Sequence, residues 1–144
     1  MKKKNQENKK DLTDFRPPLR EKETTKMYSG VSEREVLGIL LKDDQLINSV
    51  LKYIPTSKVF YHEKHEIIWK GMYALYKQNK VIDLATLTNY LSEKGYKMTY
   101  YLSGIEIIST ARLEEHAKTI YSLYVRRQLH EKILRFEARL REQT

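Results

Sequence analysis

The sequence is poor in residues on which many protein classes depend: it has no cysteine, five glycines, three prolines and one tryptophan. The absence of cysteine excludes disulfides, thiolate zinc sites and cysteine nucleophiles, and it fits a protein that is not secreted. The scarcity of glycine and proline disfavours a turn-rich β-sandwich. The longest apolar stretch, residues 36–41, is too short to cross a bilayer. We therefore expect a mainly helical, soluble, cytoplasmic protein with no membrane partner.

Positive charge is concentrated toward the two ends of the chain, whose formal net charge is +8. Residues 1–31 hold nine basic and five acidic residues, a net charge of +4, whereas residues 32–111 hold ten and nine. Residues 112–144 hold eight basic and five acidic residues, a net charge of +3. This distribution predicts one nearly neutral domain with basic ends, which can meet phosphates or an acidic protein surface, or simply keep the protein soluble.

The first segment, residues 1–31, lacks a sustained apolar period and holds the pair Pro17-Pro18. This composition predicts a flexible basic tail that is disordered or weakly docked. Four apolar residues can pack on the domain or on a partner: Phe15, Leu19, Met27 and Tyr28. The candidate nucleic-acid contacts in the tail are Lys2, Lys3, Lys4, Lys9 and Lys10.

The middle segment, residues 32–111, has the pattern of a compact orthogonal multi-helix bundle. Ser32 and Glu35 have the spacing of a capping box, which predicts that the first helix begins at Ser32. The second helix is expected to be capped by Asp43 or Asp44 and to end at Pro55. The following elements are predicted to be a helical turn at 57–60, a buried helix at 62–78, a helix from Asp83 to Gly95 and a short helix within 100–108.

The last segment, residues 112–144, contains no glycine or proline and is predicted to form the longest helix. Its apolar stripe is longer than the small core, so its second half should need a neighbour. A solvated helix face is an equally weighted interpretation, and both are favoured over direct DNA binding. The candidate protein interface consists of Tyr121, Tyr124, Arg126, Arg127, Leu129, Ile133, Phe136 and Leu140.

No arrangement of residues indicates catalysis. His62 and His65 lie one residue closer than the two histidines of the H-E-x-x-H zinc motif, so we expect a helix start with one histidine packed against the core. The sequence has no phosphate-binding glycine loop and no G-x-S-x-G motif. We therefore predict a protein that is not an enzyme and uses no cofactor or metal.

The order of these elements resembles the N-terminal domain of DnaB-type replicative DNA helicases, over roughly residues 31–135. The opening stretch SEREVLGILL at 32–41 is similar to the family's acidic residue followed by V-L-G and an apolar pair. Phe60-Tyr61 with His65 looks like the family's F-Y-x-x-x-H segment. The sequence IDLATL at 82–87 matches the family's I-D-x-x-T-L helix start, and residues 121–127 lie where its Y-A-x-I-V…R-R helix stands.

The resemblance implies a non-catalytic domain that self-associates as a dimer or larger assembly and docks a primase, a helicase or a helicase loader. The chain can be a fragment of a full helicase, since it ends after what looks like the first arm of the family's helical hairpin. It can also be a complete small protein of a phage or mobile element that modulates the host helicase. A small basic DNA-binding protein is the alternative outside this family.

Overall fold

The computed structural model describes residues 27–105 and 109–143, and within these ranges the chain is helical without strands. The all-α prediction is confirmed. No helix in the described part of the chain is long and apolar enough to cross a membrane. The α-helices are α3 (Gly30–Lys42), α4 (Ile47–Val50), α5 (Glu63–Lys77), α6 (Leu84–Glu93), α7 (Thr99–Ser103) and α8 (Leu113–Glu142), with 3₁₀ turns η1 (Asp44–Leu46) and η2 (Ser57–Val59).

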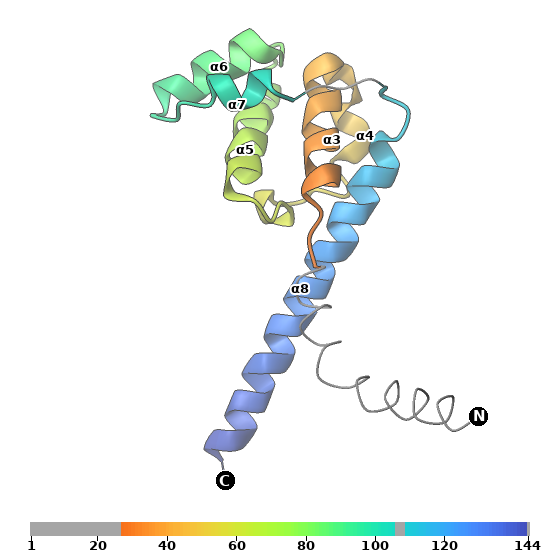
Figure 1. Cartoon of the computed structure of the whole chain (residues 1–144), viewed down its shortest axis with the longest axis vertical. Coiled ribbons are helices and arrows are strands. Elements are labelled where there is room, and N and C mark those ends of the chain that lie inside the picture. Colours follow the sequence, from red (N-terminus) through yellow and green to blue (C-terminus); the bar gives the residue numbers. More distant parts are fainter. Residues whose placement is uncertain (1–26, 106–108, 144) are drawn as a thin grey trace, which may run out of the picture.

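A globular part is formed by α3 to α7 together with the first half of α8, while the second half of α8 projects from it (Figure 1). Helix α3 packs along α8 on one side and against α5 on another, and α6 covers α5. Most of α3 is therefore inside the protein, with Val36, Leu37 and Leu40 fully buried. The core is completed by residues such as Ile68 and Met72 of the helix predicted at 62–78, which the structure places at Glu63–Lys77.

The first helix begins earlier than the sequence pattern predicted. Its N-cap is Ser29, whose side chain accepts a hydrogen bond from the Ser32 amide at 3.2 Å, and Ser32 lies inside the first turn. The Ser32 hydroxyl instead lies 3.1 Å from Nδ1 of His116 on α8. The predicted capping box at Ser32 and Glu35 is thus wrong, because the cap position is taken by the serine one turn earlier.

The second predicted helix is shorter than expected. Asp43 does cap the segment, since its carboxylate accepts from the Gln45 amide at 3.2 Å. Only Ile47–Val50 is α-helical, however, and the chain continues to Ile54 in hydrogen-bonded turns before Pro55. The predicted turn at 57–60 is present as η2. Broken segments of this kind allow Ile47, Val50 and Ile54 to be buried at a corner of the globule.

Helix α6 has the boundaries that its sequence predicted. The Asp83 carboxylate accepts from the Thr86 amide, and the Thr86 side chain accepts from the Asp83 amide, which is a complete capping box. The helix is followed by Gly95 with a φ of +90°, a conformation that favours glycine. Gly71 allows α5 to approach α6, because a Cβ there would lie 2.8 Å from a Leu87 methyl carbon.

Among the described residues between α6 and α8 there is one short helix, α7, which spans Thr99–Ser103 and so lies near the start of the range 100–108 within which a short helix was predicted. Part of that prediction, residues 106–108, lies outside the described residues. Leu102 of α7 is buried in the core. The predicted long last helix is present as α8, which runs without interruption over 30 residues.

Candidate protein-interaction site

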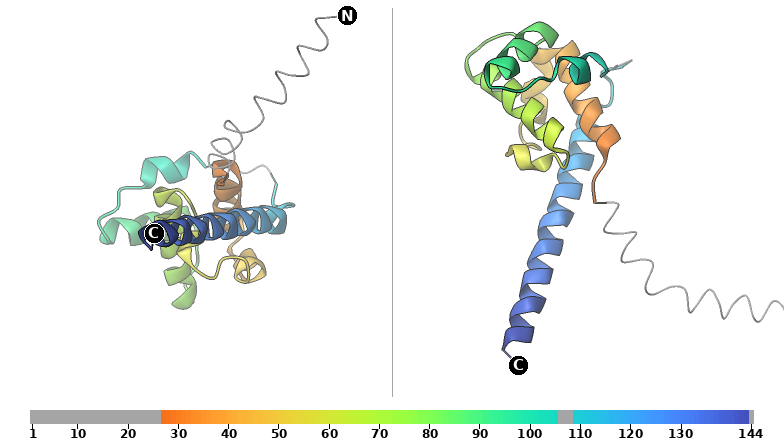
Figure 2. Two further views of the ribbon diagram at one scale, coloured as in Figure 1. Left: turned by 90° about the horizontal axis from the view of Figure 1, so that it is seen from below. Right: turned by 60° about the vertical axis from the view of Figure 1, so that its left-hand side comes forward.

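The candidate site is the second half of α8, which leaves the globular part (Figure 1 and the right-hand view of Figure 2). Leu113, Ala117 and Ile120 bury the first half of the helix against the globule. Every residue from 131 to 142 is exposed. Five large apolar side chains in this half are 50–63% exposed: Leu129, Ile133, Leu134, Phe136 and Leu140. All but Leu134 share one side of the helix, and we call these four the distal face.

The distal face is not a continuation of the stripe that α8 buries in the core. At about 100° per residue, the directions of Leu113, Ala117 and Ile120 average roughly 170° away from those of the distal face. The distal face therefore looks away from the globule side of the helix. The sequence pattern had been interpreted as one continuing stripe, and the structure separates it into two faces on opposite sides of α8.

Arg127, predicted to be an interface residue, is instead engaged inside the protein. Its guanidinium donates to the backbone carbonyl oxygens of Met27 at 2.6 Å and Val59 at 3.0 Å. It also lies over the rings of Tyr61 and Tyr124, at 5.4 and 5.9 Å from their centres. Burial lowers the pKa of Arg127 from its ordinary value, while the nearby charge of Glu33 raises it. Arg127 joins three segments and is a structural residue.

The other predicted interface residues remain at the surface to different degrees. Tyr124 is half-buried beneath Arg127, whereas Tyr121 and Arg126 are exposed. Arg126 lies one turn before Leu129 and extends the distal face toward the globule. The tail candidates Lys2, Lys3, Lys4, Lys9 and Lys10, together with Phe15 and Leu19, lie outside the described residues.

The segment just before α3 is docked, although the sequence grouped it with the tail. Tyr28 stacks on Tyr61 with ring centres 4.3 Å apart and meets the edge of His62 at 5.4 Å. Since the Met27 carbonyl accepts from Arg127, the chain enters the fold at the midpoint of α8. Met27 and Tyr28, two of the tail residues expected to be able to pack on the domain, thus contact the globular part.

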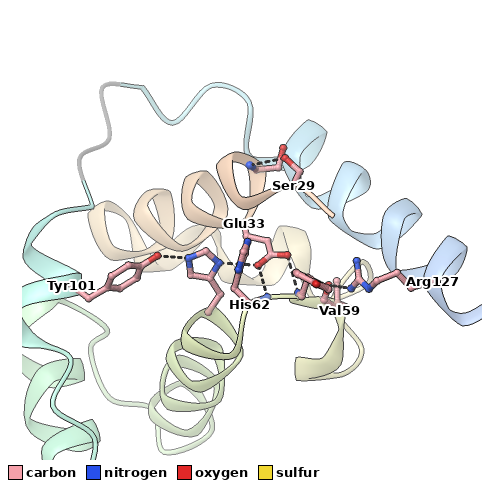
Figure 3. Close-up of polar contacts among 9 residues, drawn as sticks. Ser29, Glu33, Val59, His62, Tyr101 and Arg127 are labelled. Atoms are coloured by element: carbon pink, nitrogen blue, oxygen red, sulfur yellow. Dashed lines mark hydrogen bonds and ion pairs between the residues drawn. The ribbon is translucent and has the colours of Figure 1, made fainter. Parts of the chain in front are cut away.

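A buried carboxylate lies beneath this entry segment (Figure 3). Glu33 of α3 is 1% exposed, and its oxygens accept from the Tyr61 amide at 2.8 Å and the His62 amide at 3.3 Å. Nδ1 of His65 lies 2.8 Å from the same carboxylate. Glu33 thus satisfies the amides of the two residues that lead into α5, a helix with no hydrogen bond from the side chain of its N-cap, His62.

His65 links this carboxylate to α7. A carboxylate only accepts hydrogen bonds, so Nδ1 of His65 donates to Glu33, while Nε2 is hydrogen-bonded to the Tyr101 hydroxyl. Burial raises the pKa of Tyr101; Arg34 lowers it and Glu33 raises it further. The expectation that one histidine packs against the core is confirmed by His65, which is buried. The sequence analysis missed the role of Glu33 because its partners Tyr61, His62 and His65 lie 28, 29 and 32 residues later in the chain.

These contacts are structural, and each donor in the chain from Glu33 to Tyr101 has an acceptor within the protein. Among residues 27–105 and 109–143, no group of three histidine, aspartate or glutamate side chains is placed to hold a metal ion. His62 contributes its ring to the aromatic cluster with Tyr28 and Tyr61.

Comparison with known proteins assigns the fold. The sequence model of the family described as DnaB-like helicase N terminal domain matches residues 25–122, more than half of the chain. The chain belongs to this family. The DnaB-like resemblance of the sequence is thereby confirmed. The distal face of this DnaB-like domain lies after the last matched residue.

Two curated relatives carry replication-helicase names. The "Probable replicative DNA helicase" of Trieres chinensis is 31% identical over 110 residues, which are 71% of this chain and 24% of that protein. The "Replicative DNA helicase DnaB" of Rhodothermus marinus is 32% identical over 103 residues, which are 67% of this chain and 11% of that protein. The DnaB-like chain thus matches only a small part of the length of either relative.

A solved structure shares the fold. The crystal structure of the N-terminal domain of DnaB helicase from Mycobacterium tuberculosis superposes with a TM-score of 0.69 at 22% sequence identity. The match covers 75% of this chain and 82% of that one. The agreement supports the DnaB-like arrangement of the described helices.

Proposed function

We propose that this chain is a non-catalytic protein-interaction domain of DNA replication, which self-associates and docks a replication protein such as a primase, a helicase or a helicase loader. The observation that carries the proposal is the distal face, which exposes four large apolar side chains on a helix that leaves the globule. Membership of the DnaB-like family supports the link to replication.

Leaving the apolar side chains of the distal face in water costs free energy that a partner can recover by covering them. Full burial of a leucine, isoleucine or phenylalanine side chain contributes about 1.5–3 kcal/mol. The four residues of the distal face each expose half or more of their surface. A partner that covers them gains most of this free energy without ordering the helix, because its first half is anchored in the globular part.

Solution mass tests the self-association. The wild-type chain should exceed the monomer mass in light scattering on a sizing column, and Ile133→Asn should shift it toward monomer. The matched control is Leu134→Asn, since Leu134 is 51% exposed, close to the 56% of Ile133, but lies about 100° away around the helix. Equal association of wild type and Ile133→Asn would contradict this part of the proposal.

Co-elution tests the docking. The chain is mixed with the helicase-binding domain of the primase from its own organism, and with the helicase and its loader in separate runs. We expect one of these proteins to co-elute with the wild type and to be lost with the double variant Ile133→Asn and Phe136→Asn. Failure of all three to bind, combined with steeply salt-dependent binding to DNA, would favour a DNA-binding protein instead.

A further inference from the structure

A hollow of about 530 Å³ lies in the globular part, between the first turns of α3, the start of α5 and α7. It is lined by Gly30 and Arg34 of α3, by residues 62–65 and by Tyr101 of α7. Sites for small molecules usually have volumes of about 300–1,000 Å³, so the hollow has the size of such a site. None of its lining residues belongs to α8, so its shape does not depend on the distal face.

Two positive charges at this hollow lack an acidic partner. Arg34 is exposed, and no hydrogen bond or ion pair joins it to another residue in the described part of the chain. Lys64 is also exposed, and its ammonium lies 5.1 Å from the centre of the Tyr101 ring. Burial raises the pKa of Tyr101, whereas the nearby charge of Arg34 lowers it. A ligand bound beside Tyr101 is therefore close to both cations.

The other side chains of the hollow limit which ligands fit. Glu63 is the one carboxylate among the lining residues, so two basic residues and one acidic residue leave a formal net charge of +1, with histidines counted as neutral. Both ring nitrogens of His65 already have hydrogen-bond partners in the protein. The side chains of Arg34 and Lys64 can only donate hydrogen bonds. The hollow thus favours an anionic ligand, which Glu63 opposes in part.

A phosphate group suits this arrangement better than a carboxylate. A phosphate ester carries a charge of about −1.5 to −2 at neutral pH, so it can offset Arg34 and Lys64 together. The guanidinium of arginine can donate two parallel hydrogen bonds to a phosphate, and a lysine adds a compact positive charge. A phosphate group alone fills little of a hollow of about 530 Å³, so there is room for a further organic group.

We propose that this hollow binds a small phosphate-bearing molecule, whose phosphate group is held by Arg34 and Lys64. The inference goes beyond the proposed function and does not rest on it. A bound ligand would contact α3, the start of α5 and α7 at once, and so stabilise the packing of these segments. We therefore expect the ligand to raise the melting temperature and to slow hydrogen exchange of the amides of α7.

Isothermal titration calorimetry of the full chain at constant ionic strength tests the site with three probes: inorganic pyrophosphate, ADP and adenosine. We expect pyrophosphate and ADP to bind and adenosine not to bind, because adenosine lacks phosphate. Tighter binding of ADP than of pyrophosphate would identify the ligand as a nucleotide, and equal binding would show that only the phosphate groups are recognised. Adenosine binding as tight as that of ADP, or no binding of either phosphate compound, would overturn the proposal.

Charge variants with opposite expected effects locate the site. Arg34→Gln and Lys64→Gln should each weaken the binding of ADP roughly fivefold, whereas Glu63→Gln should strengthen it roughly twofold by removing a repulsion. The control Lys77→Gln changes the net charge as Lys64→Gln does, but it lies at the other end of α5, about 20 Å away at 1.5 Å per residue. Equal weakening by Lys64→Gln and Lys77→Gln would reduce the effect to net charge and overturn the site.

Amide resonances provide a second readout that maps the ligand. Those of Gly30, Lys64 and Tyr101 should shift when ADP is added, and that of Lys77 should not. Shifts confined to residues outside the hollow would contradict the proposal. The fluorescence of the single tryptophan, Trp69, which is 3% exposed, verifies that each variant is folded.

The outcomes for this site and for the proposed function are independent. A chain that binds ADP through Arg34 and Lys64, but neither self-associates nor docks a replication protein, keeps this site and rejects the proposed function. A chain that associates through the distal face but binds neither pyrophosphate nor ADP rejects this site alone.

Discussion

The two halves of α8 are continuous in backbone but opposite in environment. The first half presents Leu113, Ala117 and Ile120 to the globular part, and the second half presents its distal face away from it. Both halves are helical in one unbroken run of 30 residues without glycine or proline. The local sequence thus maintains the helix in both halves, whereas the burial of each half is determined by what lies beside its apolar face.

The largest effect on stability is expected from loss of the buried carboxylate of Glu33 in the globular part. Glu33→Ala should lower the free energy of unfolding by about 3–5 kcal/mol, because it leaves His65 and the amides of Tyr61 and His62 without their acceptor. Denaturant titration followed by Trp69 fluorescence measures this. The control is Glu35→Ala on the same helix, which should change stability by less than about 0.5 kcal/mol. An equal loss of stability in Glu33→Ala and Glu35→Ala would show that Glu33 has no special role.

A matched pair of isoleucines compares the two halves of α8 directly. Ile120 is 1% exposed and Ile133 is 56% exposed. Ile120→Ala should cost about 2–4 kcal/mol because it opens a cavity in the core, whereas Ile133→Ala should cost less than about 0.5 kcal/mol. The measurement is chemical unfolding at concentrations where the chain is monomeric. A similar cost at both positions would show that the second half also packs on the globule in solution.

The junction between the halves is tested at two neighbouring arginines. Arg127→Met should destabilise the fold by about 1.5–3 kcal/mol, since it removes the donor to the Met27 and Val59 carbonyls. Arg126→Met should be nearly neutral because that side chain is exposed. Hydrogen exchange of residues 27–31 provides a second readout, and these amides should exchange faster only in Arg127→Met. Unchanged exchange would mean that the entry segment docks without Arg127.

The smallest expected effect is a difference in stability at alkaline pH. The raised pKa of Tyr101 means that the unfolded chain loses this proton first, so its contribution to stability is complete below about pH 10 and is lost above it. Tyr101→Phe should cost about 0.5–1.5 kcal/mol at pH 8 through the lost hydrogen bond to His65, and less above pH 10. Tyr100→Phe, where the side chain is 94% exposed, should follow the wild-type pH profile. A difference in the free energy of unfolding between Tyr101→Phe and wild type that does not change with pH would argue against a raised pKa of Tyr101.

Much of the fold was predictable because its signals are local. Asp83 with Thr86 and Gly95 mark both ends of α6, and the absence of glycine and proline marks α8 as continuous. The start of α3 was mispredicted because two serines, Ser29 and Ser32, lie one turn apart and both suit a cap. The choice between the two serines depends on which cap position places Glu33 in the interior. Sequence alone does not show this, because the partners of Glu33 lie far along the chain.

The exposure of the candidate interface was predictable, whereas its role as an interface stays a prediction. Leu129, Ile133, Phe136 and Leu140 are exposed, as expected from a stripe longer than the core. The internal contacts of Arg127 were not foreseen, because its acceptors are backbone carbonyls 100 and 68 residues earlier in the chain. The pattern of side chains in a sequence does not show which backbone carbonyls accept hydrogen bonds. A basic residue that binds such carbonyls within the protein therefore cannot be told by sequence from one that binds another protein.

The anchoring of α8 over only part of its length makes it a lever. From Leu129 to Glu142 the helix extends roughly 20 Å at 1.5 Å per residue, with its pivot near Arg127 and the Met27 carbonyl. A tilt of about 10° at that pivot would move the tip by roughly 3.5 Å, slightly more than the rise of two residues. A small change in the packing of Tyr28, Tyr61 and Arg127 would thus produce a larger displacement of any protein bound at the C-terminal end of α8.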